Sequence, residues 1–78
     1  MVVELVEDLA RRLVDEPDAV RVERLDDDDE LVLRLYVAEA DRGKVIGRQG
    51  RIARALRTVV RASAAQEQQR VRLEIVDD

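Results

Sequence analysis

The chain of 78 residues contains no cysteine, no histidine, no tryptophan and no phenylalanine, and Tyr36 is its one aromatic residue. Without cysteine and histidine, the sequence offers no disulfide framework, no thiolate or histidine-activated nucleophile and none of the usual zinc ligands. A single tyrosine also falls short of the several aromatic side chains on which RRM and cold-shock folds stack bases. We therefore expect a protein that is not an enzyme and that carries no metal or cofactor.

Long apolar runs are missing as well. No stretch approaches the roughly 20 apolar residues of a membrane span, and the first five residues, which include Glu4, lack the basic region of a signal peptide. A chain of 78 residues forms one domain, 1–78, whose thin core leaves little room for a deep substrate pocket. These features favour a cytoplasmic interaction module with no membrane contact.

The charged residues are unevenly distributed along the chain. The net charge is −4, which by itself argues against a nucleic-acid partner. However, seven of the fourteen basic residues and none of the eighteen acidic residues fall between positions 42 and 61. The basic residues in that window are Arg42, Lys44, Arg48, Arg51, Arg54, Arg57 and Arg61. This pattern indicates a basic face on an acidic body, as in nucleic-acid-binding proteins, although solvating arginines on a helix would give the same balance.

Three segments have helical character. In residues 2–14 the apolar positions have a period near 3.6, and Pro17 ends the pattern. These positions are Val2, Leu5, Val6, Leu9 and Leu13, which we expect to face the core. A short helix is expected over 38–46, ending at Gly47, and a longer one over 50–65. The apolar positions of the longer helix are Ile52, Ala55, Leu56, Val59 and Ser63.

Alternating patterns predict strands at 20–25, 31–37 and 71–75. The acidic segment from Asp26 to Glu30 is expected to be a solvated turn that lets the first two strands pair; chelation of a hard cation is the alternative. Tyr36 is expected to pack across the strands rather than stack on a base. The predicted order is α-β-β-α-α-β, an α+β fold in a single domain.

The most informative segment is Gly43-Lys44-Val45-Ile46-Gly47-Arg48-Gln49-Gly50-Arg51-Ile52, which lies between two helical patterns. Its glycine spacing fails the dinucleotide fingerprint, and Val45 after Lys44 fails the P-loop motif. The remaining candidate is a GXXG loop, which clamps the backbone of about four nucleotides. Glycine lets the chain reverse tightly, and the free N–H groups at the start of the next helix accept phosphate.

The arginines of the 50–65 helix share one side. At about 100° per residue, they fall within an arc of about 120° opposite the apolar positions. They are Arg51, Arg54, Arg57 and Arg61. A planar guanidinium group donates two parallel hydrogen bonds to phosphate. We expect such contacts beside the loop, whereas Arg57 and Arg61 lie far enough away that a solvated face remains an alternative.

From Gly43 to Val60 the sequence resembles the core of small bacterial KH-domain RNA-binding proteins of the KhpA type, and the resemblance extends over essentially the whole chain. It implies a type II-like KH domain with a three-stranded mixed sheet and helices packed on one face. It also implies that residues 47–50 meet the RNA backbone and that Ile46 lies on the apolar floor of a groove for bases. The expected RNA-binding residues are Lys44, Ile46, Gly47, Arg48, Gln49, Gly50, Arg51 and Arg54.

The same resemblance implies an RNA chaperone or post-transcriptional regulator linked to cell elongation and division. It further implies self-pairing and a larger KH-containing partner of the Jag type. Small residues near the end of the long helix, around Val60 and Ala64, permit either a helix–helix dimer contact or ordinary core packing. The alternative function is a protein-interaction module that has a KH fold and little affinity for RNA.

Overall fold

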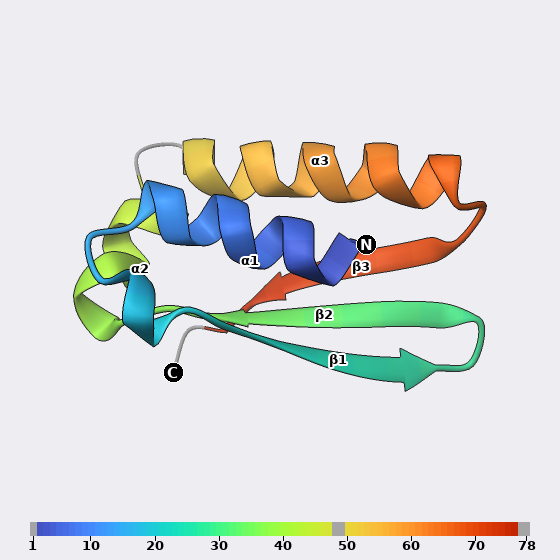
Figure 1. The fold of residues 1–78 in the computed structure, drawn as a ribbon, viewed down its shortest axis with the longest axis horizontal. Coiled ribbons are helices and arrows are strands. Elements are labelled where there is room, and N and C mark those ends of the chain that lie inside the picture. Colours follow the sequence, from blue (N-terminus) through green and yellow to red (C-terminus); the bar gives the residue numbers. More distant parts are fainter. Residues whose placement is uncertain (1, 48–49, 77–78) are drawn as a thin grey trace.

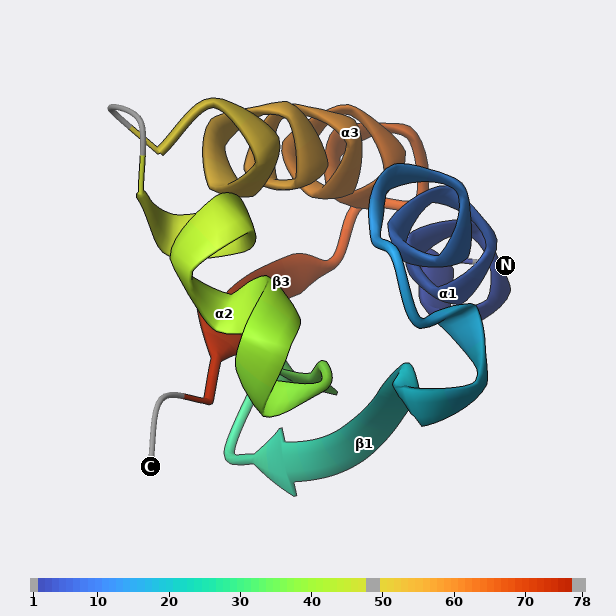
Figure 2. The ribbon, with the colours of Figure 1, turned by 90° about the vertical axis from the view of Figure 1, so that its left-hand side faces the viewer.

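A three-stranded sheet and two long helices form the two layers of the molecule, as shown by a computed structural model that describes residues 2–47 and 50–76 (Figure 1). The elements in chain order are α1 (Val2–Leu13), the 3-10 turn η1 (Pro17–Ala19), β1 (Arg21–Asp27), β2 (Glu30–Tyr36), α2 (Glu39–Ile46), α3 (Arg51–Gln66) and β3 (Arg70–Ile75). The predicted order α-β-β-α-α-β is therefore confirmed. Figure 2, viewed nearly along the helices, shows α1 and α3 on one side of the sheet and α2 at its near end.

The sheet is mixed, with β2 in the centre. It pairs antiparallel with β1 and parallel with β3, so that Leu33 lies opposite Arg24 on one side and Leu73 on the other. Because successive side chains of a strand point to opposite faces, Leu31, Leu33 and Leu35 all face the helices, and each is at most 2% exposed. The predicted alternation of β2 is therefore confirmed.

Helix α1 packs through only part of the predicted stripe, since Val2 and Val6 are buried and Leu9 is partly buried against the core. Its buried residues are Val2, Val6 and Ala10, and Val14 just beyond the helix continues the same stripe. Leu5 is 40% exposed and Leu13 is 36% exposed, so the expectation that both face the core is wrong. Both stripes have the four-residue spacing that aligns side chains along a helix, and packing against α3 and β1 selects the one that contains alanine and valine.

Helix α3 is also rotated relative to the prediction. Ala53, Leu56, Val60 and Ala64 are buried against the sheet and α1, whereas Ala55 is exposed. Ile52, Val59 and Ser63 lie at the edge of the buried stripe and are partly exposed. Val60 and Ala64 therefore belong to the core, and a dimer contact through these two residues is excluded by their burial.

The acidic segment between β1 and β2 is a tight hairpin rather than a five-residue turn. Asp27 pairs with Glu30, and Asp26 pairs with Leu31, so the strands extend into the segment. Asp28 has φ = 56°, a left-handed conformation that aspartate tolerates better than most residues. The turn is therefore made by residues 28 and 29 alone.

The sheet face opposite the helices is covered by paired charges. Arg34 lies 3.3 Å from Glu74 and 3.9 Å from Glu23, and the hydrogen bond to Glu74 raises the pKa of Arg34 above its usual range. The hydroxyl group of Tyr36 donates to the carboxylate of Glu23 at 3.1 Å. The guanidinium group of Arg21 lies 4.6 Å from the centre of the Tyr36 ring. Arg21 and Tyr36 are cross-strand partners, which confirms that Tyr36 packs across the strands.

Among the helices of the described residues, none combines the length and apolar character needed to cross a membrane.

Candidate nucleic-acid interface

The loop between α2 and α3 requires glycine at positions 47 and 50, and the physical reason differs between the two positions. A Cβ atom on Gly47 would overlap the carbonyl oxygen of Gly43, which accepts a 2.7 Å hydrogen bond from the Gly47 backbone N–H. Gly50 has φ = 65°, a left-handed conformation that costs other residues energy. Its N–H donates to the carbonyl oxygen of Gly47 at 2.8 Å. A hydrogen bond therefore joins the end of α2 to the residue before α3.

Helix α2 places the residues that precede the loop. Val45 is buried at 1% exposure and fixes the last turn of α2 on the core, while the next residue, Ile46, is 40% exposed. An exposed isoleucine directly before Gly47 is an apolar surface available to a ligand. The predicted site residues Arg48 and Gln49 lie outside the described residues.

Asp41 fixes α2 to the segment that follows α1. Its side chain is 1% exposed, and its carboxylate accepts the backbone N–H groups of Asp15 at 3.1 Å and Glu16 at 3.0 Å. A buried carboxylate is costly unless it is hydrogen-bonded, and these two donors provide that compensation. These hydrogen bonds fix α2 against the segment that follows α1. They therefore also fix the start of the glycine loop.

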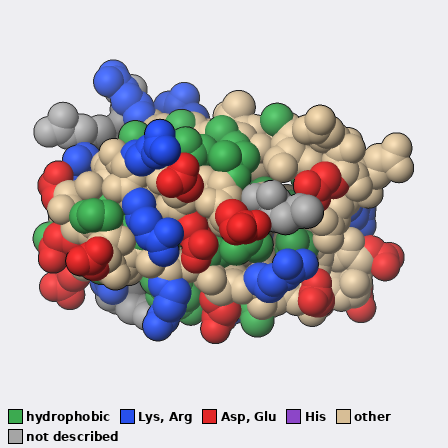
Figure 3. Space-filling view, viewed as in Figure 1, with side chains coloured by type: hydrophobic (Ala, Val, Ile, Leu, Met, Phe, Trp, Pro, Cys, Tyr) green, Lys and Arg blue, Asp and Glu red, His purple; other side chains and the backbone are tan. Residues whose placement is uncertain are grey.

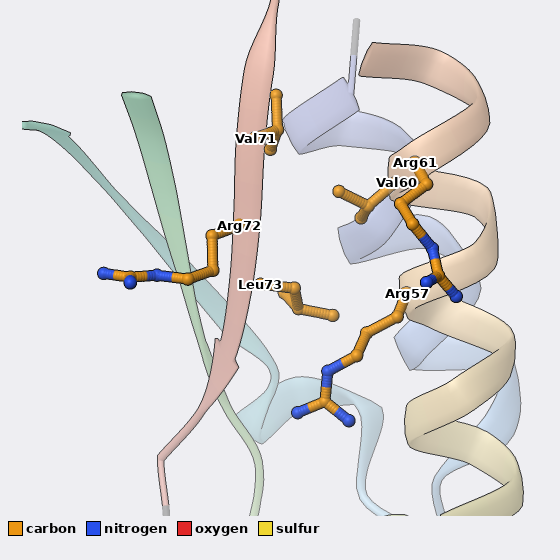
Figure 4. A pocket seen from close by; sticks show the side chains of 6 residues that line it. All are labelled: Arg57, Val60, Arg61, Val71, Arg72 and Leu73. Atoms are coloured by element: carbon orange, nitrogen blue, oxygen red, sulfur yellow. The ribbon is translucent and has the colours of Figure 1, made fainter. Parts of the chain in front are cut away.

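A hollow of about 170 Å³ lies between α3 and the edge strand β3. It is lined by Arg57, Val60, Arg61, Val71, Arg72 and Leu73. Figure 4 shows the side chains of Arg57 and Arg61 on the α3 side of this hollow and those of Val71 and Leu73 on the strand side. Arg72 points to the opposite side of β3, where it lies 3.8 Å from Glu30 and 3.4 Å from Glu74.

A second, wider recess of about 600 Å³ lies at the start of α3, toward α1. It is lined by Asp15, Gly43, Lys44, Arg51 and Ile52. The Nζ atom of Lys44 lies 3.2 Å from Oδ1 of Asp15, so this lysine points to the end of α1 rather than to β3. The two hollows therefore share no lining residue, and each is bordered by basic side chains.

The four arginines of α3 do not form one continuous rim. All four are exposed, and Figure 3 shows basic side chains grouped over the first part of the helix. Arg51 lines the recess toward α1, while Arg57 and Arg61 line the hollow toward β3. Within the described residues, no hydrogen bond or ion pair engages the side chains of Arg51, Arg57 or Arg61.

The structure places most of the predicted site residues around the loop. Lys44, Ile46, Gly47, Gly50 and Arg51 lie around the loop, and Arg54 lies one turn into α3. Val71 and Leu73 of β3 line the neighbouring hollow, and sequence reasoning did not place them at the site. Their alternation identified a strand, but only the parallel pairing of β3 with β2 places that strand beside α3.

In residues 2–47 and 50–76, no group of three or more acidic side chains is close enough to hold a metal ion, and this includes the hairpin from Asp26 to Glu30.

Two helices joined by a glycine loop, with two strands before them and one after, define a type II KH domain. The family model for the KH domain of KhpA/KhpB matches residues 3–75. The chain belongs to this family, which is non-enzymatic.

Curated relatives are similar over nearly their full length. The RNA-binding protein KhpA of Halalkalibacterium halodurans is 55% identical over 94% of this chain and 96% of its own. The protein of the same name from Caldanaerobacter subterraneus is 51% identical over 94% of this chain and 97% of its own. For Bacillus subtilis KhpA the identity is 46%, with 95% of this chain and 92% of the relative covered.

One solved structure shares the fold. Aquifex aeolicus Era bound to GDP·AlF4− superposes with a TM-score of 0.63 at 21% sequence identity. The match covers 95% of this chain and 29% of Era, and it supports the fold alone.

Proposed function

We infer that this chain binds single-stranded RNA, with the loop at residues 47–50 against the RNA backbone and the bases along the hollow between α3 and β3. The observation that carries this proposal is a hollow that begins about two turns along α3 from the glycine loop. It has an apolar wall and two guanidinium groups that are unpaired among the described residues. Curated relatives that are about half identical are named RNA-binding proteins, which supports the same function.

The chemistry of the hollow suits a nucleobase and its phosphate. Val71 and Leu73 offer an apolar surface to the flat face of a base, while Arg57 and Arg61 are placed to donate to the phosphate that follows it. A volume of about 170 Å³ is small, so it holds part of one base at a time. Most of the contact with RNA is therefore expected along the surface between the loop and β3.

The proposal is tested by titrating a fluorescent single-stranded RNA with the wild type and with Arg48→Asp/Gln49→Asp. The variant keeps both loop glycines, and circular dichroism checks that it folds. We expect wild-type binding that weakens with salt, because phosphate contacts release counterions, and no binding by the variant. Equal binding by both proteins would place the RNA elsewhere, and no binding by the wild type would overturn the RNA-binding function.

We further propose that this binding serves an RNA chaperone or post-transcriptional regulator in the cytoplasm, linked to cell elongation and division. A single KH loop contacts about four nucleotides, so its affinity is low unless a second site is joined to it. Pairing with a larger KH-containing protein of the Jag type would supply that site. The family model, which includes both KhpA and KhpB domains, supports such a partner.

Self-association is a second candidate function, and the surface between α1 and α3 favours it. Leu5 on α1 is 40% exposed, Val59 on α3 is partly exposed, and Ala55 and Ala62 extend the small apolar surface of α3. Figure 3 shows hydrophobic side chains exposed in this region. A second copy of the chain would cover these side chains, whereas Val60 is already buried.

Analytical ultracentrifugation of the wild type and Leu5→Lys over a range of concentrations tests this candidate. We expect a dimer for the wild type and a monomer for the variant, because a lysine buried between the two copies would lose its hydration. A wild-type monomer at high micromolar concentration would exclude self-association.

A further inference from the structure

The recess toward α1 shares no lining residue with the hollow at β3, and it has a different composition. Its lining residues come from the segment after α1, from α2 and from the first turn of α3. Gly43 leaves open space here, since nothing lies within 4 Å of the Cβ that another residue would carry. At about 600 Å³ the recess is large enough to accept a ribose and its phosphate.

Two cations and one anion border the recess. Arg51 is exposed, and no ion pair engages it within the described residues. Lys44 is paired with Asp15 at 3.2 Å, and the side chain of Asp15 is 79% exposed. A pair this exposed is weak, because water and salt screen it. A phosphate group brought close to Lys44 can therefore replace the carboxylate as its partner.

We propose that the recess toward α1 is a second phosphate subsite for RNA, formed by Lys44 and Arg51, and that Asp15 competes with the phosphate for Lys44. The inference rests on the proposed binding of RNA by the loop and extends it. The nucleotides held by the loop and the hollow at β3 are followed by one whose phosphate enters this recess. Asp15 lowers the affinity of that step and weakens its dependence on salt, because it neutralises the charge of Lys44.

The side chain of Asp15 can be changed without disturbing the link between α1 and α2. The hydrogen bond to Asp41 uses the backbone N–H of Asp15, not its carboxylate. Asp15→Asn therefore removes the negative charge from the recess while the anchoring hydrogen bond stays. Asp8→Asn is the matched control, since Asp8 lies on α1, carries the same charge and pairs with Arg12 at 3.3 Å, away from the recess.

The test compares the affinity for two RNA molecules of different length. The short RNA, of about four nucleotides, contacts the loop alone, and the longer RNA, of about ten nucleotides, also reaches the recess. We expect Asp15→Asn to bind the longer RNA more tightly by up to about fivefold, the range that a surface ion pair allows. Its salt dependence should steepen by about 0.7 in log–log slope, corresponding to one more phosphate bound. The affinity for the short RNA should equal that of Asp8→Asn.

A double-variant cycle locates the effect. In Asp15→Asn/Lys44→Gln the gain for the longer RNA should disappear, because the freed lysine is its cause. An equal gain in Asp8→Asn, an equal gain for the short RNA, or a gain that survives Lys44→Gln would each overturn the subsite. If none of the proteins binds either RNA, the proposed function itself fails; if all bind alike, only the subsite fails.

Inorganic phosphate distinguishes RNA from a free anion as the ligand of the recess. In an amide NMR titration of Asp15→Asn, the longer RNA should shift the signals of Gly43 and of the substituted position at concentrations where inorganic phosphate does not. Shifts caused by phosphate and not by RNA would identify a free-anion site and overturn the proposal.

Discussion

The carboxylate of Asp41 accepts a hydrogen bond from the backbone N–H of Glu16, with 3.0 Å between the two atoms. A second bond comes from the N–H of Asp15 at 3.1 Å. These bonds fix α2 beside the segment that follows α1. Among the polar residues that the structure describes, Asp41 is the most deeply buried, and it also sets where the glycine loop begins.

Asp41→Ala should therefore destabilise the fold. The change leaves two partly buried N–H groups without an acceptor, which costs about 1–3 kcal/mol of unfolding free energy for each such group. Urea unfolding followed by circular dichroism measures the loss. Asp41→Asn keeps one acceptor oxygen and should lose less. A loss in Asp41→Ala no larger than that in Asp8→Ala would contradict the anchoring role.

The three glycines of the chain should respond differently to alanine. In Gly47→Ala the new Cβ overlaps the Gly43 carbonyl oxygen, so the loop must shift. Gly50→Ala keeps the space but strains a residue at φ = 65°, at a cost of about 1–2 kcal/mol. Gly43→Ala lies in a helix with open space around it and should stabilise the protein by about 0.5–1 kcal/mol. Thermal unfolding ranks the three, and a stabilising Gly47→Ala would contradict the packing of the loop.

Because α1 buries Val6 and leaves Leu5 exposed, substitutions of these two neighbouring residues should differ in their effect on stability. Val6→Ala removes two methyl groups from the core and should cost about 2 kcal/mol of unfolding free energy. Leu5→Ala removes a larger side chain that is 40% exposed, and its effect should stay within about 0.5 kcal/mol. Urea unfolding of both variants tests the contrast, and the reverse order would show that Leu5 faces the core.

The same helix shows what the sequence can and cannot reveal. Its period predicted a helix ending before Pro17, and the structure agrees. The choice between the stripe with Leu5 and the stripe with Ala10 depends on the shape of the surface against which the helix packs. Hydrophobicity ranks leucine above alanine, but close packing against α3 and β1 favours the smaller residue, and a single sequence does not contain that information.

Some features of the candidate site could likewise be predicted from the sequence, and others could not. The spacing of Gly47 and Gly50 predicted the loop, because each glycine is required by the local backbone. A Cβ atom at Gly47 would overlap the Gly43 carbonyl oxygen, and Gly50 has a positive φ. The direction of Lys44 toward Asp15 and the hollow beside Leu73 depend on how distant segments pack. A local pattern therefore identifies where the chain turns, while tertiary structure decides which side chains share a surface.

Arg57 and Arg61 should contribute to RNA binding by donating to phosphates. In Arg57→Gln/Arg61→Gln the log–log salt slope of binding should fall by about 0.7 for each phosphate that is no longer bound. Fluorescence anisotropy at several salt concentrations measures it. Arg11→Gln/Arg24→Gln removes the same charge from α1 and β1 and should leave the slope almost unchanged. Equal slopes for the two double variants would mean that the arginines of α3 only solvate the helix.

The most direct test of the proposed interface is an amide NMR titration of the wild type with a short single-stranded RNA. We predict that the largest shifts fall on Gly47, Gly50, Val71 and Leu73, which border the loop and the hollow at β3. Amides of β1, on the opposite edge of the sheet, should stay in place. Shifts concentrated on β1 or on α1, with none at the loop, would contradict RNA binding at this site.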